Sequence, residues 1–350
     1  MAKPSTRSAE PRLPKRPRLR AGLAVYDRSP GEIQIGLDPR HAMVATELSP
    51  DLVRAVRSLD GRHRTDELLA MATAENTDYL RELITDLTRL GLVEESWTPA
   101  GQRRTAGEVG MWSLRARQSG ADSFVRRAHS AVVLYGAGRL TIAIATLLAT
   151  SGVGHVQVEA DGVVGELDTG SGYLDSDIGR QRRAAARDAV SRANPAVKQT
   201  RLRGDRQPEL VVLADAIVPA PEVVKMLLHE GIPHLPVRVR EGVGIVGPLV
   251  YPGRSTCLGC ADLHRKSMDP QWPTVAGQLA GRSQQADLCS VQTTAGMAVG
   301  QVLRVLDHMG GPPPPAWNTT IEIDPHGGAV SHRPWPPNPA CSCGARSPQS

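Results

Sequence analysis

The stretch AHSAVVLYGAGRLTIAIATLLATSGVGHVQVEAD, residues 128–161, carries the clearest structural pattern in the chain. A short apolar run is followed by Gly136 and Gly138, and then by a longer apolar run without Gly or Pro. A valine-containing run comes next and ends in acids. This order predicts a buried strand, a tight turn, a helix and a second, parallel strand, which is the start of an α/β Rossmann-like domain.

The glycine turn resembles a dinucleotide-binding turn only in part. In such a turn the first Gly shapes the bend, the second lets a phosphate approach the backbone, and the third lets the helix pack closely on the strand. Gly136 and Gly138 occupy the first two places, but Thr141 stands at the third. We therefore expect a degenerate nucleotide-binding turn.

Net charge and hydropathy indicate whether the chain binds nucleic acid or a membrane. The formal charge is +5, but residues 1–20 carry seven Lys or Arg and a single acid, Glu10, so the rest of the chain sums to −1. A Pro/Arg-rich segment of this kind buries too little apolar surface to fold, and we expect a disordered basic tail over 1–20. No apolar run approaches the ~18 residues of a membrane span, and no signal-peptide core follows the charges. The sequence predicts a cytoplasmic protein without a membrane partner.

Residues 21–96 predict a small α+β module with a winged-helix-like order of elements. Ser49 and Pro50 mark the start of a helix, because Ser is a favoured N-cap and Pro is favoured at the first helical position. Gly91 ends the last helix, at a place that favours a residue without a Cβ. The three expected strands and three expected helices cover residues 23–26, 33–37, 43–48, 50–59, 65–72 and 80–90.

A winged helix raises the question of DNA binding, which the charges argue against. The third expected helix and its approach carry four acids and two arginines, a net charge of −2 that repels phosphates. These residues are Glu75, Asp78, Glu82, Asp86, Arg81 and Arg89. We expect no nucleic-acid partner.

Two segments of this module resemble a known peptide-binding element. SLDGRHRTDELLAMA, residues 58–72, and LITDLTRLGLVEE, residues 83–95, are similar to the PqqD-like leader-peptide recognition element of ribosomal peptide biosynthesis. The resemblance implies that a precursor's leader peptide adds as a strand beside the third strand and packs on the third helix, a form of β-augmentation. The acidic helix favours a leader with basic residues; a winged helix used only for docking is the alternative. The implied peptide-binding residues are Met43, Val44, Ala45, Tyr79, Leu80, Leu83 and Leu87.

Residues 97–128 are polar, with scattered Arg and Gly and no sustained periodicity, and predict a linker with at most a short helix. Beyond it, residues 129–335 resemble the ThiF/MoeB family of adenylating enzymes, relatives of ubiquitin-activating enzyme. The motifs that carry this resemblance are DIGRQRRAAARDAVSRANPAV, VVLADAIVP and GVGIVGPLVYPGRSTCLGC. The segment HLPVRVREGVGIVGPLVYPGRSTCLGCADLHRKSMDPQWP, residues 234–273, is closer still to the ThiF-like partner proteins of YcaO cyclodehydratases. Those proteins handle thiazole/oxazole-modified precursor peptides (TOMMs).

The resemblance implies site residues for an adenylating enzyme. Asp161 matches part of the acidic cluster that holds ribose and metal, Asp215 matches the Mg²⁺-binding Asp, and Arg182 lies near the expected Lys. The phosphate-binding Arg is missing from DGVVGELDTGSGYLD, where Glu166 and Asp168 add negative charge instead. Arg180 is the alternative cation.

That missing cation bears on catalysis. Loss of one charge-stabilising donor costs roughly 10²-fold in rate, and replacing a cation by acids costs more. We expect a non-catalytic or degenerate adenylyltransferase homologue in which ATP and Mg²⁺ binding is doubtful.

The cysteines predict a structural metal site. Cys257 and Cys260 form a C-x-x-C pair, and Cys341 and Cys343 form a C-x-C pair in the C-terminal segment 336–350. Four thiolates suit tetrahedral zinc. Cys289 stands apart, as a buried hydrophobe or, alternatively, a thioester nucleophile.

These observations favour an adaptor that binds a leader peptide and presents the precursor to a YcaO-type cyclodehydratase; a homodimer is left open. The main rival is an ATP-dependent adenylyltransferase acting on a peptide or carrier-protein carboxylate. A second rival is an NAD-dependent oxidoreductase with Glu159 on the ribose, although DIGRQR, ANP and the cysteine pairs have no part in hydride transfer.

Overall fold

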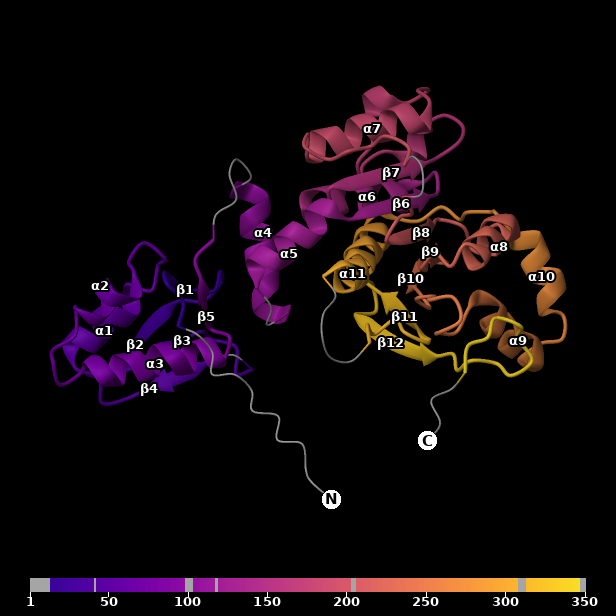
Figure 1. Ribbon diagram of the computed structural model, residues 1–350. Coiled ribbons are helices and arrows are strands. Elements are labelled where there is room, and N and C mark those ends of the chain that lie inside the picture. Colours follow the sequence, from indigo (N-terminus) through magenta and orange to yellow (C-terminus); the bar gives the residue numbers. More distant parts are fainter. Residues whose placement is uncertain are drawn as a thin grey trace, which may run out of the picture. The chain divides into compact units, whose positions relative to one another are not determined.

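The computed structural model describes residues 13–40, 42–97, 103–116, 119–202, 206–307 and 313–346. The chain forms two compact units, residues 1–124 and 125–350. Figure 1 shows both, coloured along the sequence. None of the helices in the described ranges combines the length and hydropathy that a bilayer crossing needs.

The first unit contains a three-stranded antiparallel sheet in the order β2-β3-β4. Ile33 of the central strand lies opposite Ala45, and Gln34 lies opposite Val44. The inward side chains Ile33 and Ile35 are almost fully buried, as the period-two pattern requires. The strands are β2 (Val25–Ser29), β3 (Glu32–Ile35) and β4 (Met43–Ala45).

Three helices pack on this sheet. The expected start of the first helix is confirmed, with Ser49 at the N-cap and Pro50 in the first turn. Apolar residues at helical spacing, including Leu52, Val56 and Ile84, lie in one core with Ile33 of the sheet. The helices are α1 (Pro50–Arg57), α2 (Thr65–Leu69) and α3 (Thr77–Arg89).

Part of the expected N-terminal tail is folded. Strand β1 (Pro17–Leu19) pairs antiparallel with β5 (Val93–Glu95), and Arg20 N donates to Leu92 O at 2.9 Å. The expectation of disorder up to residue 20 is wrong for these residues. Their side-chain composition does not predict a strand, but their backbone N–H and C=O groups pair with a strand about 75 residues away. Residues 1–12 of that tail lie outside the described residues.

The expected linker is helical over most of its described length. Helix α4 (Arg103–Ala116) buries Val109, and a second helix, α5, covers Gly120–His129. Arg127 near the end of α5 forms a fully buried ion pair with Asp307, at 2.7 Å. A buried charge requires such a partner, and the partner lies 180 residues away, beyond any local pattern.

The second unit is built on a seven-stranded sheet in the order β12-β11-β10-β9-β8-β6-β7. The strands β7, β6, β8 and β9 run parallel, and the remaining neighbours are antiparallel. The predicted strand, turn, helix and parallel strand of residues 128–161 are confirmed. The strands are β6 (Ala131–Tyr135), β7 (His155–Glu159), β8 (Leu210–Ala214), β9 (His234–Arg240), β10 (Val243–Val246), β11 (Thr319–Asp324) and β12 (Ala329–Pro334).

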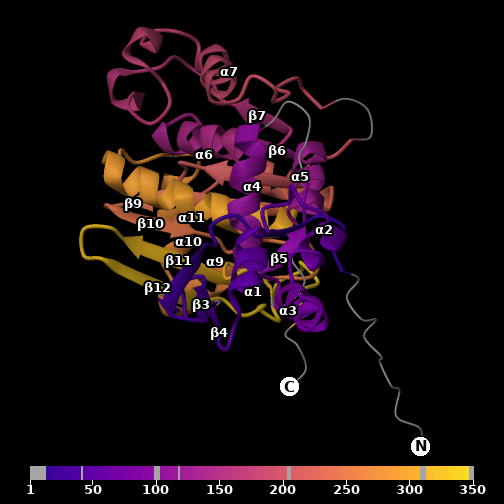
Figure 2. The same ribbon diagram turned by 90° about the vertical axis from the view of Figure 1, so that its left-hand side faces the viewer.

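Helices cover both faces of this sheet. Figures 1 and 2 show α6 and α11 side by side on one face, and Figure 1 shows α8 on the other, where Leu227 packs against Val133 and Leu213. Helix α7 packs on α6 and β7. The helices are α6 (Arg139–Thr150), α7 (Arg182–Ala193), α8 (Pro221–His229), α9 (Leu258–Met268), α10 (Trp272–Leu279) and α11 (Leu288–Leu306); short 3₁₀ turns span Glu166–Asp168 and Asp175–Asp177.

Candidate functional site

A cavity of about 320 Å³ lies at the carboxyl ends of β6, β7 and β8. This is the edge of a parallel sheet where ligands bind in open α/β folds. Gly136, Glu159 and Asp215 line it, together with Tyr135, whose pKa is raised by burial and by the nearby charge of Glu159. The sequence-predicted glycine turn and Asp215 are thus brought together.

Gly136 and Gly138 make room for a carboxylate of the chain itself. A Cβ on Gly138 would lie 2.8 Å from Asp215 Oδ1, and one on Gly136 would lie 2.9 Å from Asp215 Oδ2. Both distances are too short for real side chains. The two glycines therefore let Asp215 approach the turn.

Asp215 caps the N-terminus of α6. Its Oδ2 accepts a 2.8 Å hydrogen bond from the N–H of Gly138, and it also accepts one from the hydroxyl of Thr141. Burial raises the pKa of Asp215, and these hydrogen bonds to the charged form oppose that rise. Thr141, which breaks the glycine pattern, thus supplies a donor to an internal anion at a helix N-terminus that could otherwise hold phosphate.

A second cavity of about 250 Å³ lies on the other side of Asp215. Arg139, the first residue of α6, lines it; its Nε donates to Thr169 O at 2.9 Å and its Nη1 to Ala286 O at 3.2 Å. Arg139 was not among the site residues predicted from the sequence. The available signal was a cation directly after the second glycine.

The other expected site residues are paired or exposed. Arg182 forms a 2.7 Å ion pair with Asp168, so the cation near the expected Lys position neutralises the acid in the segment that lacks the phosphate Arg. Asp161, expected to hold ribose and metal, has a fully exposed side chain, and its closest ion-pair contact is 3.9 Å to Arg183. Arg183 lies closer to Glu159, at 2.6 Å.

Arg180, the alternative phosphate cation, is also engaged. It pairs with Asp177 and Asp188, and these contacts hold the pKa of the guanidinium above its ordinary value. Arg180 lines neither cavity. Its place in the structure therefore gives it no contact with either space.

Four cysteines form a compact cluster. The Sγ of Cys257 lies 3.9 Å from that of Cys260 and 3.6 Å from that of Cys341, and the Sγ of Cys260 lies 3.5 Å from that of Cys343. These separations are far longer than a disulfide bond of about 2.05 Å. Tetrahedral zinc with Zn–S bonds of about 2.3 Å requires sulfurs about 3.8 Å apart. The cluster could therefore hold a metal ion, and in the described part of the chain no other group of His, Cys, Asp or Glu side chains does so.

The lone cysteine lies elsewhere. Cys289 is exposed at the start of α11 and does not belong to the cluster. The interpretation of Cys289 as a buried hydrophobe is wrong, because the residue lies in the first turn of α11 on the solvent side.

In the first unit, β4 is an edge strand beside a cleft. Its neighbour in the sheet is β3, and its other side has no strand partner among the described residues. Val44 on β4 and Tyr79 on α3 are exposed by 43% and 45%, whereas Ala45 is buried. Of the other residues expected to contact a peptide, Met43 is half-buried and lines the cleft. Leu80, Leu83 and Leu87 lie in the core and form the base of α3, not its surface.

The cleft itself has a volume of about 370 Å³ and lies where the start of β4 meets the end of α3. Three arginines line the cleft. Each forms an ion pair with an acid, but none of these three acids lines the cleft. This is the opposite of the charge expected from the acidic surface of α3. The arginines are Arg20, Arg40 and Arg89.

A parallel sheet with a glycine turn after its first strand and an aspartate after its third defines a Rossmann-like domain of the nucleotide-binding type. The chain belongs to the ThiF family, whose model matches residues 113–345. That range holds the turn, Asp215 and all four clustered cysteines. A search of curated proteins found no match.

Solved structures share the fold along nearly the whole chain. E. coli MccB with succinimide has a TM-score of 0.70 and 12% identity, over 94% of this chain and 98% of that chain. The microcin C7 biosynthetic enzyme MccB with N-formylated MccA has a TM-score of 0.69 and 12% identity, over 94% and 99%. PaaA has a TM-score of 0.65 and 18% identity, over 89% and 98%. These identities establish a common fold.

Proposed function

We propose that this ThiF-family protein binds the leader of a ribosomal precursor peptide and presents the precursor to a YcaO-type cyclodehydratase, without adenylating it. The observation that carries the non-catalytic part is the contact between Asp215 and the N-terminus of α6. The observation that carries the peptide-binding part is the open edge of β4.

The charges around the two cavities disfavour a triphosphate. Their described lining residues include four acids and a single cation, Arg139, which already donates to two backbone carbonyls. A transferring adenylyl group needs positive charge aimed at its oxygens. The acids are Glu159, Asp161, Asp168 and Asp215.

The helix N-terminus argues in the same direction. The backbone N–H of Gly138 and the hydroxyl of Thr141 both bond Asp215, and a phosphate at that place would lie against this carboxylate. Nucleotide binding would first have to displace Asp215 or bridge it with Mg²⁺. The contacts of Asp215 at the N-terminus of α6 therefore favour a protein that keeps the ThiF fold but does not adenylate.

The first unit supports a peptide ligand. An edge strand offers unpaired N–H and C=O groups, and an added strand gains main-chain hydrogen bonds there. Val44 and Tyr79 provide exposed apolar contacts, and the cleft beside Met43 supplies a pocket. MccB, of similar fold, has been solved with MccA. Because three arginines line the cleft, we now expect an acidic leader residue there, in place of the basic ones expected from α3.

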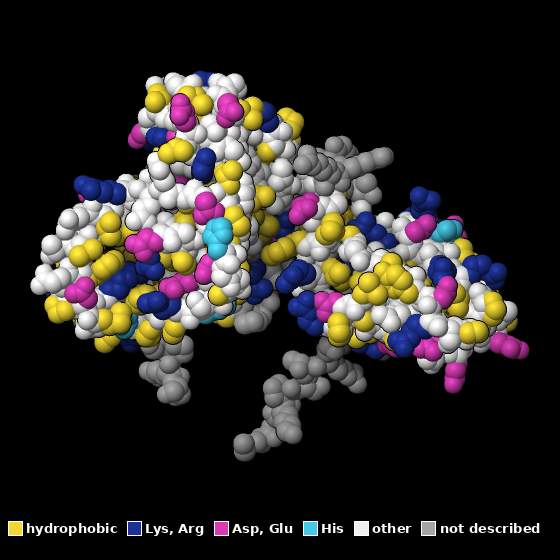
Figure 3. Space-filling view, turned by 180° about the vertical axis from the view of Figure 1, so that it is seen from behind, with side chains coloured by type: hydrophobic (Ala, Val, Ile, Leu, Met, Phe, Trp, Pro, Cys, Tyr) yellow, Lys and Arg dark blue, Asp and Glu magenta, His cyan; other side chains and the backbone are white. Residues whose placement is uncertain are grey.

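The surface charges fit a peptide partner better than nucleic acid. On the visible face of each unit in Figure 3, acidic and basic side chains are interspersed, and the described residues there form no continuous basic stripe. Nucleic-acid binding depends on such a stripe, because phosphate neutralisation supplies most of the affinity.

The cysteine cluster fits structural zinc. All four coordination positions are filled by thiolates from two segments about 80 residues apart, so a bound ion would join the start of α9 to the C-terminal segment. No position is left open for catalysis.

The alternative function is ATP-dependent adenylation of a peptide carboxylate. One observation favours it: the shared fold extends over 94% of this chain to E. coli MccB, which has been solved with ATP. Asp215 would then hold Mg²⁺ after leaving Thr141.

One experiment separates the two functions. The full chain is titrated with the leader of the precursor encoded beside its gene, and ATP–pyrophosphate exchange is measured with and without that peptide. Leader binding without exchange supports the adaptor. Exchange that needs both peptide and Asp215 establishes the adenylyltransferase, and no leader binding removes the adaptor.

A further inference from the structure

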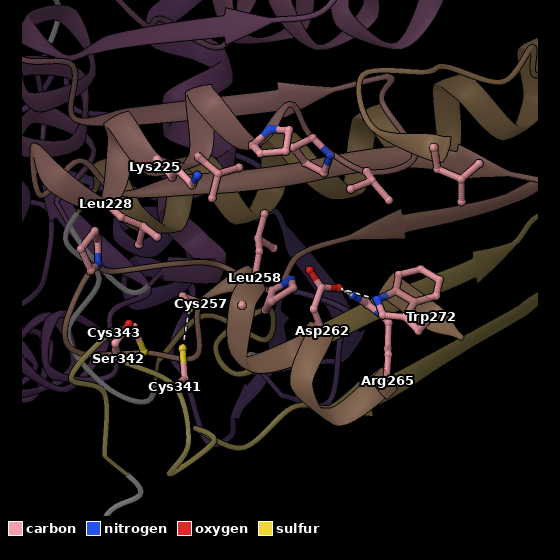
Figure 4. Close-up of a pocket in the computed structure, with 18 of the residues that line it drawn as sticks. Lys225, Leu228, Cys257, Leu258, Asp262, Arg265, Trp272, Cys341, Ser342 and Cys343 are labelled. Atoms are coloured by element: carbon pink, nitrogen blue, oxygen red, sulfur yellow. Dashed lines mark hydrogen bonds and ion pairs between the residues drawn. The ribbon is translucent and has the colours of Figure 1, made fainter. Parts of the chain in front are cut away.

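A larger cavity, of about 700 Å³, lies on the α8 side of the second unit's sheet. Among its described lining residues it shares only Pro219 with the cavity at the glycine turn. Figure 4 shows Lys225 and Leu228 of α8 on one side, residues of α9 on the other, and the cysteine segment at one end. The function proposed above makes no use of this space.

The walls are mainly apolar. Val224 of α8 lines the cavity. Leu228 of α8 faces Leu258 of α9, and the ring of Trp272 at the start of α10 closes the far end (Figure 4). Cavities of several hundred cubic ångströms with such walls are typical of small-molecule sites, where a few polar groups fix the orientation of the ligand.

One of the lining residues is a buried arginine whose side chain has no hydrogen-bond or ion-pair partner in the described part of the chain. The side chain of Arg238, near the end of β9, is only 8% exposed and lines the cavity. Among the described residues nothing forms a hydrogen bond or an ion pair with it. Burial lowers the pKa of Arg238 to about 9; the charges of Arg265 and Arg240 contribute, and the more weakly acting acids Asp262 and Glu322 oppose the shift. The group is therefore still positive at pH 7. A buried charge of this kind is costly unless an anion compensates it.

The acid at this cavity is already used. Asp262 accepts a 2.8 Å hydrogen bond from Arg265 and a 3.0 Å hydrogen bond from the indole N–H of Trp272. Arg265 also stacks over Trp272, with its Cζ 5.2 Å from the ring centroid. These contacts hold the ring of Trp272 in the wall of the cavity. Because Asp262 already pairs with Arg265, the charges of Lys225, Arg238 and Arg240 make the lining net positive.

We propose that this cavity binds a carboxylate carried by an apolar or aromatic body, with Arg238 holding the carboxylate and Leu228, Leu258 and Trp272 enclosing the body. A guanidinium pairs with a carboxylate through two parallel hydrogen bonds. A free aromatic acid and the C-terminal residue of a peptide present the same chemistry, and the volume accommodates either.

Two matched pairs of probes test the proposal by calorimetry on the full chain. The first pair is 1-naphthylacetate and its neutral amide; the second is N-acetylphenylalanine and its amide, which represent a peptide C-terminus. We expect an acid to bind at least about tenfold more tightly than its amide, because a hydrogen-bonded charge adds to the apolar contact. The pair with the tighter acid identifies the source of the ligand.

Variants assign the effect to residues. Arg238→Gln should reduce the preference for acid over amide to about one, whereas Arg187→Gln, an exposed arginine of α7 with the same charge change, should leave it intact. Leu228→Trp fills the cavity and should weaken both members of a pair, which keeps the test available if Arg238→Gln does not fold. Equal binding of acid and amide, no binding of either acid, or an unchanged preference in folded Arg238→Gln overturns the proposal.

Discussion

The hydroxyl of Thr141 donates a hydrogen bond to the carboxylate of Asp215, across the turn that joins β6 to α6. Thr141 stands where a nucleotide-binding turn has its third glycine, and Asp215 stands where the ThiF resemblance implies a metal ligand. The residue that departs from the glycine pattern thus donates to the residue that keeps the family's expected position. This pairing carries the proposal that the fold is retained without adenylation.

Replacing Thr141 by Val should destabilise the protein by about 1–3 kcal/mol at pH 7, because the half-buried carboxylate of Asp215 loses a donor. The matched control is Thr146→Val on the same helix, whose hydroxyl bonds only its own helix's carbonyls, at 3.0 Å to Ile142 O. It should cost less than about 0.5 kcal/mol. Equal losses in denaturant unfolding would show that Asp215 gains nothing from Thr141.

The stability lost in Thr141→Val should decrease as the pH is lowered. Burial raises the native pKa of Asp215, so its carboxyl contributes stability below the ordinary pKa of about 3.9 and loses it as pH rises through the native pKa. Thr141 bonds the charged form and reduces that loss. The gap between wild type and Thr141→Val should therefore be smaller near pH 4 than at pH 7. A gap that grows on acidification contradicts the assignment.

ATP–pyrophosphate exchange should be undetectable for the chain alone and with leader peptide. The cavities on both sides of Asp215 present four acids and one engaged arginine, and loss of one stabilising donor already costs roughly 10²-fold. The assay is radiolabelled pyrophosphate incorporation. Asp215→Asn serves as its control, and exchange that is present in wild type and absent in this variant would establish the adenylyltransferase.

Metal analysis should find one equivalent of zinc per chain. Cys260→Ser should lose it and melt at a lower temperature, because a thiolate site contributes folding free energy. Cys289→Ser is the matched control, since Cys289 is exposed and outside the cluster, and it should keep both zinc and melting temperature. A metal-free wild type with unchanged melting would remove the zinc assignment.

Val44→Pro should weaken leader binding by about tenfold or more, because proline on β4 disturbs the edge that an added strand needs. Tyr26→Pro is the control: β2 is the opposite edge of the same sheet, and Tyr26 is exposed by 40%, close to the 43% of Val44. It should leave the dissociation constant within about threefold of wild type. Calorimetric titration and far-UV circular dichroism separate lost binding from lost folding. Equal weakening by both prolines points away from β4.

Local pattern accounts for much of the fold. The period of the apolar residues in 128–161, the glycines after β6 and the Ser49–Pro50 helix start are features of neighbouring residues, and each predicted its element. The C-x-x-C and C-x-C spacings likewise indicated the four cysteines that the structure brings together. Such signals are readable because a helix, a strand or a metal knuckle depends on residues a few positions apart.

Pairings between distant segments were not readable in this way. Strand β1 forms only by pairing with β5, and the buried charge of Arg127 is compensated only by Asp307. The local composition of the tail and of the linker contains neither partner, so it predicted disorder and a linker where the structure has a strand and a helix. Leu80, Leu83 and Leu87 looked suited to a peptide surface, but the stripe that makes a helix amphipathic is the stripe that the core buries. The Asp215–Thr141 contact and the position of Arg238 in its cavity have the same origin. In both cases the neighbouring residues come from strands and helices that are distant in sequence and pack together only in the folded protein. No spacing between residues in the sequence predicts such contacts.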